Sequence, residues 1–313
     1  MNNKLISIIS PLFNEEENIE KHYHELCNVL KKLNHFNSYE IIFVNDGSFD
    51  KSLQILKKLA TQDKNLKIIS FSRNFGHEQA STAGLQATKD SAVVLIDADG
   101  QDPPELILEF EKEYSNGFDI VYGQRSKRLK ESFFKKITSK AFYPIFKFLT
   151  KIDIPRDTGD FCLLSRKAVD IVNKLPEKSR FIRGLIYWGG LPKKAIPFVR
   201  RSRGGGKTKY NYSKLTIFAL ENIISFSTVP IYFMIFFSLF VIGACFIGTI
   251  VALIMKLFGC VVMTGWTSLI ISMLFLFSVT FFFLGILGLY IGKIFQEVKQ
   301  RPVYLIDEKI NFN

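Results

Sequence analysis

The sequence lacks several patterns that would identify a function directly. It has no Gly-x-Gly-x-x-Gly segment, which weakens a dinucleotide-binding interpretation. Its 4 cysteines include no Cys-x-x-Cys pair, so neither a zinc site nor a disulfide framework is indicated. Gly206-Lys207-Thr208 resembles the end of a phosphate-binding P-loop, but Arg201 stands where that motif requires a glycine.

Acidic residues are also scarce relative to basic ones. The 313 residues contain 41 Lys and Arg against 29 Asp and Glu, a formal net charge of +12. This excess favours an anionic partner: a nucleic acid, a phosphorylated substrate or an acidic membrane surface. We find no secretory signal peptide, because the apolar stretch from Lys4 to Phe13 is short and runs directly into Asn14-Glu15-Glu16. The N-terminal part is therefore expected to stay in the cytoplasm.

Charge is almost missing between Thr228 and Gly292, where Lys256 is the only charged residue. The span divides into Val229–Met255 and Trp266–Ile291, each longer than the ~20 residues that a membrane-spanning helix needs. A buried helix pair in a soluble protein is the alternative. Basic residues precede the first helix and follow the second, so both ends are predicted to be cytoplasmic, with a short external loop. The absence of acids within the helices indicates an anchor and not an ion pathway.

Before this span, predicted strands alternate with helices. The strands are Leu5–Leu12, Glu40–Val44, Leu66–Phe71, Ala92–Ile96 and Asp119–Tyr122, and the helices are Glu16–Asn34, Lys51–Gln62, Gln79–Thr88 and Pro104–Asn116. This alternation predicts an α/β fold with a doubly wound, mostly parallel sheet. We expect three regions: a cytoplasmic catalytic domain with interface helices (residues 1–227), a transmembrane hairpin (228–292) and a cytoplasmic tail (293–313).

Polar residues follow the carboxyl ends of the predicted strands. They are Asn14 and Glu15, Asp46, Arg73 and Asn74, and Asp97 and Asp99. In open α/β sheets ligands bind beyond these strand ends, so the clusters outline a crevice for a nucleotide.

The segment from Asp97 to Asp102 is the most informative one. We expect it to continue extended, so that Asp97, Asp99 and Gln101 share one side. Two carboxylates and an amide oxygen suit a hard divalent cation that bridges substrate phosphates. A polar strand-to-helix loop with a helix cap is the alternative interpretation.

A basic and aromatic segment runs from Lys127 to Lys151. This composition is typical of an amphipathic helix in a membrane interface. Single-stranded nucleic acid is the alternative ligand, but the neighbouring apolar helices favour the membrane. Asp160 then lies on a short predicted strand within Thr158–Arg166.

These motifs together resemble a known family. The segments are Pro11-Leu12-Phe13-Asn14-Glu15, Asn45-Asp46-Gly47-Ser48, Ser72-Arg73-Asn74-Phe75-Gly76, Asp97 to Pro103, Gly159-Asp160-Phe161, and Arg203 with Lys209-Tyr210. In this order they resemble the polyprenyl-phosphate glycosyltransferases, GT-A enzymes of glycosyltransferase family 2 similar to dolichol-phosphate mannose synthase. The C-terminal helix pair looks like that of the bactoprenol glucosyltransferases used in O-antigen and teichoic acid modification.

The resemblance implies a role for each matching residue. Base and ribose of the donor would be held by Pro11, Phe13, Glu15, Val44 and Asp46, with the backbone at Ala98 near the ribose. Asp97, Asp99 and Gln101 would hold Mg²⁺ or Mn²⁺, and Arg203 and Lys209 would close over the diphosphate. Arg125, Lys135 and Ser139 would bind the acceptor phosphate, and Asp160 and Asp99 are the catalytic candidates. Phe13 replaces a frequent tyrosine, and Lys135 replaces an arginine, which gives up bidentate phosphate geometry.

The function implied is inverting transfer of a hexose to undecaprenyl phosphate at the cytoplasmic face of the plasma membrane. The expected donor is UDP-glucose; mannose from GDP-mannose, N-acetylglucosamine and an aminoarabinose are the alternatives. A processive polysaccharide synthase would need more membrane helices, and a non-catalytic nucleotide-sugar sensor would not need the Asp97, Asp99 and Gln101 set. A nucleic-acid partner is disfavoured because the charge follows the membrane boundary. A homo-oligomer is one assembly we consider.

Overall fold

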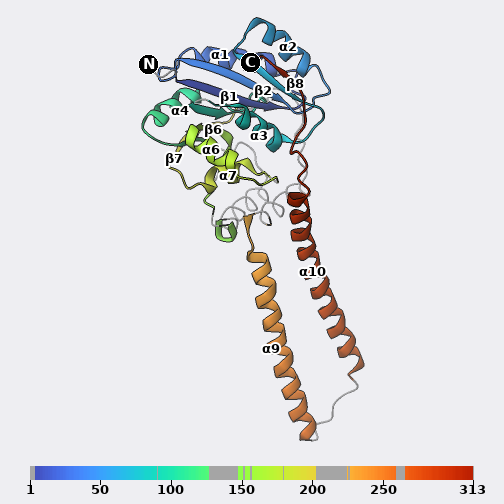
Figure 1. Cartoon of the computed structure of the whole chain (residues 1–313). Coiled ribbons are helices and arrows are strands. Elements are labelled where there is room, and N and C mark those ends of the chain that lie inside the picture. Colours follow the sequence, from blue (N-terminus) through green and yellow to red (C-terminus); the bar gives the residue numbers. More distant parts are fainter. Residues whose placement is uncertain are drawn as a thin grey trace. The chain divides into compact units, whose positions relative to one another are not determined.

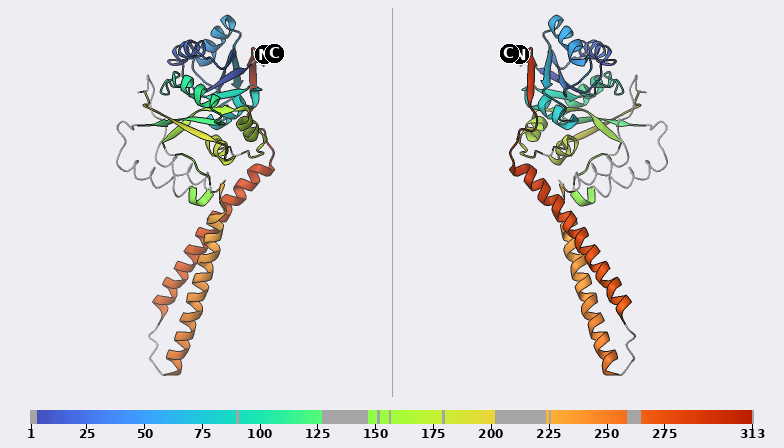
Figure 2. Two further views of the ribbon diagram at one scale, coloured as in Figure 1. Left: turned by 90° about the vertical axis from the view of Figure 1, so that its left-hand side faces the viewer. Right: turned by 90° about the vertical axis from the view of Figure 1, so that its right-hand side faces the viewer.

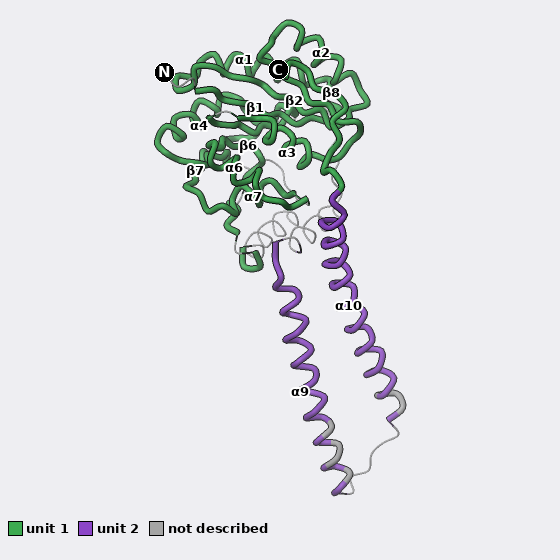
Figure 3. Tube along the Cα trace, viewed as in Figure 1, with its two compact units in different colours: residues 1–210, 301–313 green, residues 211–300 purple. Residues whose placement is uncertain are grey.

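The computed structural model describes residues 4–89, 91–126, 147–150, 152–155, 157–178, 180–201, 224, 226–258 and 265–312. The elements before the long helices are β1 (Leu5–Leu12), α1 (Ile19–Leu30), β2 (Ser38–Asn45), α2 (Ser52–Gln62), β3 (Leu66–Phe71), α3 (His77–Ala87), β4 (Ala92–Leu95), α4 (Leu106–Ser115), β5 (Ile120–Arg125), β6 (Thr158–Ser165), α6 (Arg166–Lys174), α7 (Ile182–Trp188) and β7 (Lys193–Phe198). Then follow α9 (Val229–Leu257), α10 (Trp266–Val298) and β8 (Ile306–Ile310). Two compact units result, residues 1–210 with 301–313, and residues 211–300 (Figure 3).

The first unit is built on a sheet of 8 strands in the order β7-β5-β6-β4-β1-β2-β3-β8 (Figure 1). β1 pairs in parallel with β2 and β4, β2 with β3, and β5 with β7. β6 is antiparallel to β4 and β5, and β8 is antiparallel to β3. The prediction of a mostly parallel α/β sheet is confirmed.

Helices cover both faces of this sheet because alternate strand residues are apolar on both sides. Ile6 and Ile8 of β1 belong to the core cluster that also contains the apolar faces of α1, α2 and α4. Ile9 points to the opposite face, which α3 covers. Gly84 of α3 lies so close that a Cβ added at Gly84 would be 2.3 Å from the side chain of Ile9. Both packed layers hold the central strands rigid, so their carboxyl ends provide a fixed platform for a site.

Gly47 shows how tightly the loops at this platform pack. It follows β2 with φ of +64°, and a Cβ there would lie 2.3 Å from the carbonyl carbon of Arg73. Glycine tolerates both the left-handed conformation and the close backbone approach. The loops after β2 and β3 are therefore in direct contact.

β8 is an element that the sequence analysis does not include. It lies at the edge of the sheet beside β3, as the side views in Figure 2 show. The chain thus leaves the first unit, forms the two long helices, and returns to add a strand to the same sheet.

The second unit contains α9 and α10, which begin where the predicted helices Val229–Met255 and Trp266–Ile291 begin. α9 ends two residues later than predicted, at Leu257, and α10 seven residues later, at Val298. The stretch Val229–Gly248 has a mean hydropathy of 2.4 and Leu269–Val298 one of 2.6, and 6% and 0% of their most apolar windows are buried. Such exposed apolar surface is unlike a soluble helix pair, whose apolar faces are buried. Within this unit Phe237 and Phe283 pack edge to face at 5.7 Å. Both helices are candidate membrane spans.

Candidate active site

The acidic segment after β4 turns and does not continue extended, so the expectation of a single row is wrong. Gly100 adopts a left-handed conformation with φ of +69°. The backbone N–H of Gln101 donates to Oδ1 of Asp99 at 3.1 Å, which closes a tight local turn. Asp97 and Asp99 both lie near the guanidinium of Arg200. The backbone carbonyl of Gln101 accepts a hydrogen bond from the N–H of Arg201 at 2.9 Å.

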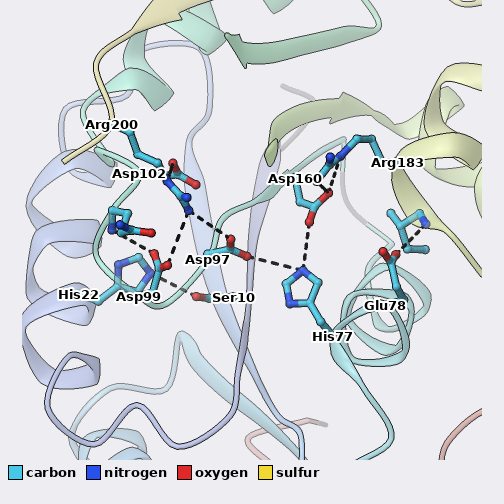
Figure 4. A network of polar contacts seen from close by, with 12 residues as sticks. Ser10, His22, His77, Glu78, Asp97, Asp99, Asp102, Asp160, Arg183 and Arg200 are labelled. Atoms are coloured by element: carbon cyan, nitrogen blue, oxygen red, sulfur yellow. Dashed lines mark hydrogen bonds and ion pairs between the residues drawn. The ribbon is translucent and has the colours of Figure 1, made fainter. Parts of the chain in front are cut away.

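His77, the first residue of α3, bridges two carboxylates (Figure 4). Its Nε2 lies 3.2 Å from Oδ2 of Asp160 and 3.6 Å from Oδ1 of Asp97. Burial alone would lower the pKa of His77, but the hydrogen bond to Asp160 and the surrounding carboxylates raise it to about 10. The imidazole is therefore a cation at neutral pH and joins β4 to β6 through charge.

Asp160 of β6 is held from its other side by Arg183 of α7. Nε and Nη2 of Arg183 donate to Oδ1 of Asp160 at 3.0 and 2.8 Å. Burial by itself would raise the pKa of Asp160, yet the charges of Arg183 and His77 hold it well below its usual range. This carboxylate is permanently ionised, and its orientation is fixed by two cations.

Glu78, the residue after His77, belongs to the same network. Its Oε2 accepts the backbone N–H of Ile182 at 2.8 Å, at the start of α7. Burial and the nearby Asp160 raise the pKa of Glu78. The pair of neighbouring residues His77 and Glu78 thus fixes both Asp160 and the helix that carries Arg183.

Arg200, which follows β7, faces the acids from the opposite side. Its guanidinium lies 3.2 Å from Oδ1 of Asp102, 3.6 Å from Oδ2 of Asp99 and 4.0 Å from Oδ2 of Asp97. Asp97 consequently stands between two cations, His77 and Arg200 (Figure 4). Burial raises the pKa of Asp97, and the adjacent carboxylates add to this effect.

Arg125 ends β5 on the same side of the site. Burial and the charge of Arg200 lower its pKa. Its buried Nε has no hydrogen-bond partner among the described residues. An added Cβ at Gly159 would lie 2.8 Å from Nη2 of Arg125, so glycine leaves the space that this guanidinium fills. A half-buried guanidinium with a buried, unused Nε donor is suited to an anion.

The residues proposed for the nucleotide lie at the ends of β1 and β2. Pro11 and Val44 are buried partners in the parallel pairing, and Phe13 contacts the exposed Phe49 edge to face at 5.9 Å. Asp46, only 3% exposed, accepts the N–H groups of Phe75 and Gly76 at 2.7 and 2.9 Å.

Two further members of the nucleotide set have separate environments. Glu15 follows β1; its N–H donates to Oγ of Ser52 at 3.0 Å and its carboxylate accepts from Asn18 at 2.7 Å. Ala98 is buried inside the acidic turn. The structure thus gathers these predicted positions at adjoining strand ends.

Four predicted site residues lie outside the described part of the chain: Lys135, Ser139, Arg203 and Lys209. So do the interface segment 127–146 and most of the basic glycine-rich loop.

Conversely, the site contains three residues that no sequence motif predicted: His77, Arg183 and Arg200. His77 directly follows the predicted Ser72–Gly76 cluster at a strand end, which is the signal that could have identified it. Arg183 belongs to a short helix far along the chain and carries no such signal.

The carboxylates of this arrangement can hold a metal ion, with the imidazolium of His77 beside them. One ligand atom from each of His77, Asp97 and Asp160 lies within 4.8 Å of the others. Carboxylate oxygens suit Mg²⁺ and Mn²⁺, and Asp97 is common to this group and to the set expected from the sequence. The donor chemistry therefore fits a divalent cation at Asp97.

Aspartates and arginines thus gather beyond the carboxyl ends of the central strands, where enzymes with a parallel α/β sheet place their active sites. Residues 7–172 match the model of the glycosyl transferase family 2. The chain belongs to this family and is a glycosyltransferase. It is 42% identical over 302 residues to the uncharacterized glycosyltransferase YkcC of Bacillus subtilis, covering 96% of this chain and 93% of that one.

A second relative has a more specific name. The chain is 38% identical over 304 residues to the prophage-derived bactoprenol glucosyl transferase of Shigella flexneri, covering 96% of this chain and 97% of that one. Among solved structures, glucosyl-3-phosphoglycerate synthase of Mycobacterium tuberculosis is similar at 17% identity with a TM-score of 0.49, over 71% of this chain and 78% of that one.

Proposed function

We propose that the protein transfers glucose from UDP-glucose to a polyprenyl phosphate such as undecaprenyl phosphate at the cytoplasmic face of the membrane. The product would be a lipid-linked glucose for modification of cell-envelope glycans. The observation that carries this proposal is the similarity to the bactoprenol glucosyl transferase of Shigella flexneri, which extends over 96% of the chain and includes the helix pair. The site supports it, because its aspartates and arginines suit a nucleotide diphosphate donor and a phosphate acceptor.

The donor would bind across the ends of β1, β2 and β4. Pro11, Phe13, Glu15, Val44 and Asp46 would contact the base and ribose, with Ala98 near the ribose. Phe13 offers a half-exposed ring for stacking, and Phe49 beside it is 83% exposed. Arg203 and Lys209 would close over the diphosphate.

By the resemblance to the family, Asp97, Asp99 and Gln101 would hold the Mg²⁺ or Mn²⁺. The geometry supports Asp97 in this role, because Asp160 and His77 lie within reach of it. When bound, the ion would stabilise the charge that develops on the departing diphosphate. Arg200 would add its own positive charge, since it already contacts Asp97 and Asp99.

The acceptor phosphate would bind at Arg125, with Lys135 and Ser139. The unused Nε donor of Arg125 supports this assignment. An oxygen of the acceptor phosphate would attack the anomeric carbon of the donor on the face opposite the diphosphate. This attack inverts the anomeric centre and gives a β-linked product from an α-linked donor. Excluding water from the site prevents loss of the donor by hydrolysis.

Asp160 would orient these groups and would not act as the base. Near neutrality a phosphate monoester is mostly a dianion, with a second pKa of about 6, so its oxygen attacks without losing a proton. Asp160 is already engaged by Arg183 and His77, and its depressed pKa makes it a poor proton acceptor.

The helix pair would span the membrane as a hairpin whose two ends lie in the cytoplasm. The chain path supports this topology: β7 before α9 and β8 after α10 belong to the same sheet. Two spans return the chain to its starting side, as this shared sheet requires. The basic residues that flank both helices favour the cytoplasmic side.

A donor panel tests the proposal. Membranes containing the protein are incubated with undecaprenyl phosphate and one donor in each reaction. The donors are UDP-glucose, UDP-N-acetylglucosamine and GDP-mannose. Lipid extracts are then analysed by mass spectrometry, with membranes containing Asp97→Asn as the matched control. We expect a hexose-bearing lipid phosphate from UDP-glucose alone. A product from another donor would replace the glucose assignment, and no lipid product from any of them would overturn the function.

A further inference from the structure

The C-terminal residues 301–312, which we call the strap, have no part in the chemistry described above. Their strand β8 has the sequence Ile306-Asp307-Glu308-Lys309-Ile310, and its residues are exposed or half-buried. Ile310 packs against the core cluster, but the other residues of this polar edge strand add little apolar area. Its firm attachment to the sheet therefore calls for another explanation.

Side-chain contacts fix the far end of the strap. Asn311, in the left-handed conformation with φ of +59°, donates its side-chain amide to the carbonyls of Ala60 and Leu66 at 2.9 and 2.8 Å. Lys57 forms an ion pair with Glu308 at 2.6 Å. The strap is thus tied to α2 and to the start of β3.

The near end of the strap contacts the loop that follows β3. The ring of Tyr304 stacks on Phe71 with centroids 4.9 Å apart and an interplanar angle of 13°. Its hydroxyl donates to Oε1 of Gln86 in α3 at 2.6 Å. The carbonyl of Leu305 accepts the N–H of Ser72 at 3.1 Å. Tyr304 consequently spans the two elements, β3 and α3, between which residues 72–76 run.

Residues 72–76 in turn connect to the active site. Phe75 packs edge to face on Phe71 at 5.7 Å, so the ring that Tyr304 covers also supports the loop. The N–H groups of Phe75 and Gly76 hold the carboxylate of Asp46. The next residue is His77, which contacts Asp97 and Asp160.

We propose that the strap positions the donor side of the active site, and that Tyr304 is its positioning residue. Stacking of Tyr304 on Phe71 restricts residues 72–76, and those residues set the places of Asp46 and His77. The identity of the donor in this inference rests on the proposed function, whereas the contacts of the strap do not.

The chain order gives this arrangement a further consequence. Only residues 299–305 lie between the end of α10 and β8. The donor side is therefore completed by a segment that is synthesised after the apolar hairpin. A catalytic domain that ends before α9 would lack the strap and would bind its donor weakly.

The test compares Tyr304→Ala with Tyr304→Phe, which keeps the stacked ring, in the full-length protein. Asp307→Asn is the control on the exposed face of β8. Tyr304→Leu retains an apolar side chain and provides a second variant in case Tyr304→Ala fails to fold. Two readouts are taken: KM for UDP-glucose and for undecaprenyl phosphate, and hydrogen–deuterium exchange of residues 71–78.

We expect Tyr304→Ala and, more weakly, Tyr304→Leu to raise the donor KM about 2- to 10-fold, the range that loss of one aromatic pair supports. The acceptor KM should stay unchanged, and residues 71–78 should exchange faster. Asp307→Asn should behave like the wild type. Tyr304→Phe, which loses only the hydrogen bond to Gln86, should change the donor KM and the exchange less than Tyr304→Ala does. Unchanged exchange, an unchanged donor KM, or equal rises in both KM values would each overturn the proposal. If the wild type does not use UDP-glucose, the proposed function is contradicted and not the role of the strap. Hydrogen–deuterium exchange of residues 71–78 then tests the strap by itself.

Discussion

Arg183 holds a single oxygen of Asp160 with two donors, Nε at 3.0 Å and Nη2 at 2.8 Å. The other oxygen of Asp160 faces His77 at 3.2 Å. Both oxygens of a carboxylate at the centre of the site are thus occupied by cations. This geometry separates an orienting role from a basic one, because a base needs a free lone pair and a pKa near the working pH.

Asp160→Asn should lower kcat at least about 10-fold, since the two cations lose their buried partner. Asp160 stays ionised in the wild type from pH 5.5 to 8 because its pKa is held well below its usual range. The ratio of mutant to wild-type kcat should therefore be flat over this interval. A mutant that recovers toward wild type as the lipid phosphate ionises near pH 6 would show that Asp160 is a base.

The same ion pairs predict how stability depends on pH. A carboxylate with a depressed pKa stabilises the fold above its unfolded pKa of about 4, and this contribution is lost as the pH falls. The difference in free energy of unfolding between wild type and Asp160→Asn should be constant between pH 6 and 8 and should shrink below about pH 4. Denaturant unfolding of the detergent-solubilised protein measures it. A difference that grows on acidification would contradict the ion-pair account.

Metal removal gives a further prediction. Asp97→Asn or Asp99→Asn should reduce turnover at least ~100-fold, the scale of losing a main electrostatic stabiliser. Activity should vanish in EDTA and return with Mg²⁺ or Mn²⁺. His77→Gln is the informative comparison, because a protonated imidazole is a counter-ion and not a ligand.

His77→Gln should therefore lower turnover without changing the Mn²⁺ concentration needed for half-maximal activity. An increase of about 10- to 100-fold in that concentration would place His77 in the coordination shell or directly behind it. Full activity of the wild type in EDTA would show that the reaction needs no divalent cation.

The basic loop supplies a prediction about the leaving group. Arg203→Ala and Lys209→Ala should each raise the KM for UDP-glucose and lower kcat, because the charge on the diphosphate grows toward the transition state. Lys207→Ala in the same loop is the control for loss of one positive charge. Effects confined to the acceptor KM would assign the loop to the lipid phosphate.

Membrane topology can be checked by cysteine labelling in a variant without its native cysteines. Phe258→Cys, at the end of α9, should react with an impermeant thiol reagent added to intact cells. Lys309→Cys on β8 should react only after the cells are opened, since β8 belongs to the catalytic sheet. The reverse labelling pattern would show that the helix hairpin crosses the membrane in the opposite orientation.

The sequence predicted the elements whose signal is local. The strands β1 to β5 were evident because each is an apolar run that ends in a polar cluster, and the apolar helices α9 and α10 were evident from their length. β8 was missed because Asp307, Glu308 and Lys309 make it polar, and its pairing with β3 joins segments far apart in the chain.

The site was predicted less completely for a similar reason. Asp97 was identified from its strand end and Asp160 from its short strand and the family resemblance, but the row through Gln101 failed because Gly100 allows a tight turn. The cations around them come from distant elements, Arg183 from α7 and Arg200 from the end of β7, and only folding brings them together. The roles assigned to Lys135, Ser139, Arg203 and Lys209 stay predictions.

The central claim is glucosyl transfer to a lipid phosphate, and the product itself tests it most directly. Purified protein in detergent is incubated with Mg²⁺, undecaprenyl phosphate and UDP-glucose labelled with ¹³C at the anomeric carbon, and the lipid fraction is examined by mass spectrometry and ¹³C NMR. The account predicts a lipid heavier by one labelled hexose, with the anomeric carbon bonded through oxygen to phosphorus in the β configuration. Labelled free glucose with no labelled lipid, or an α-linked product, would contradict it.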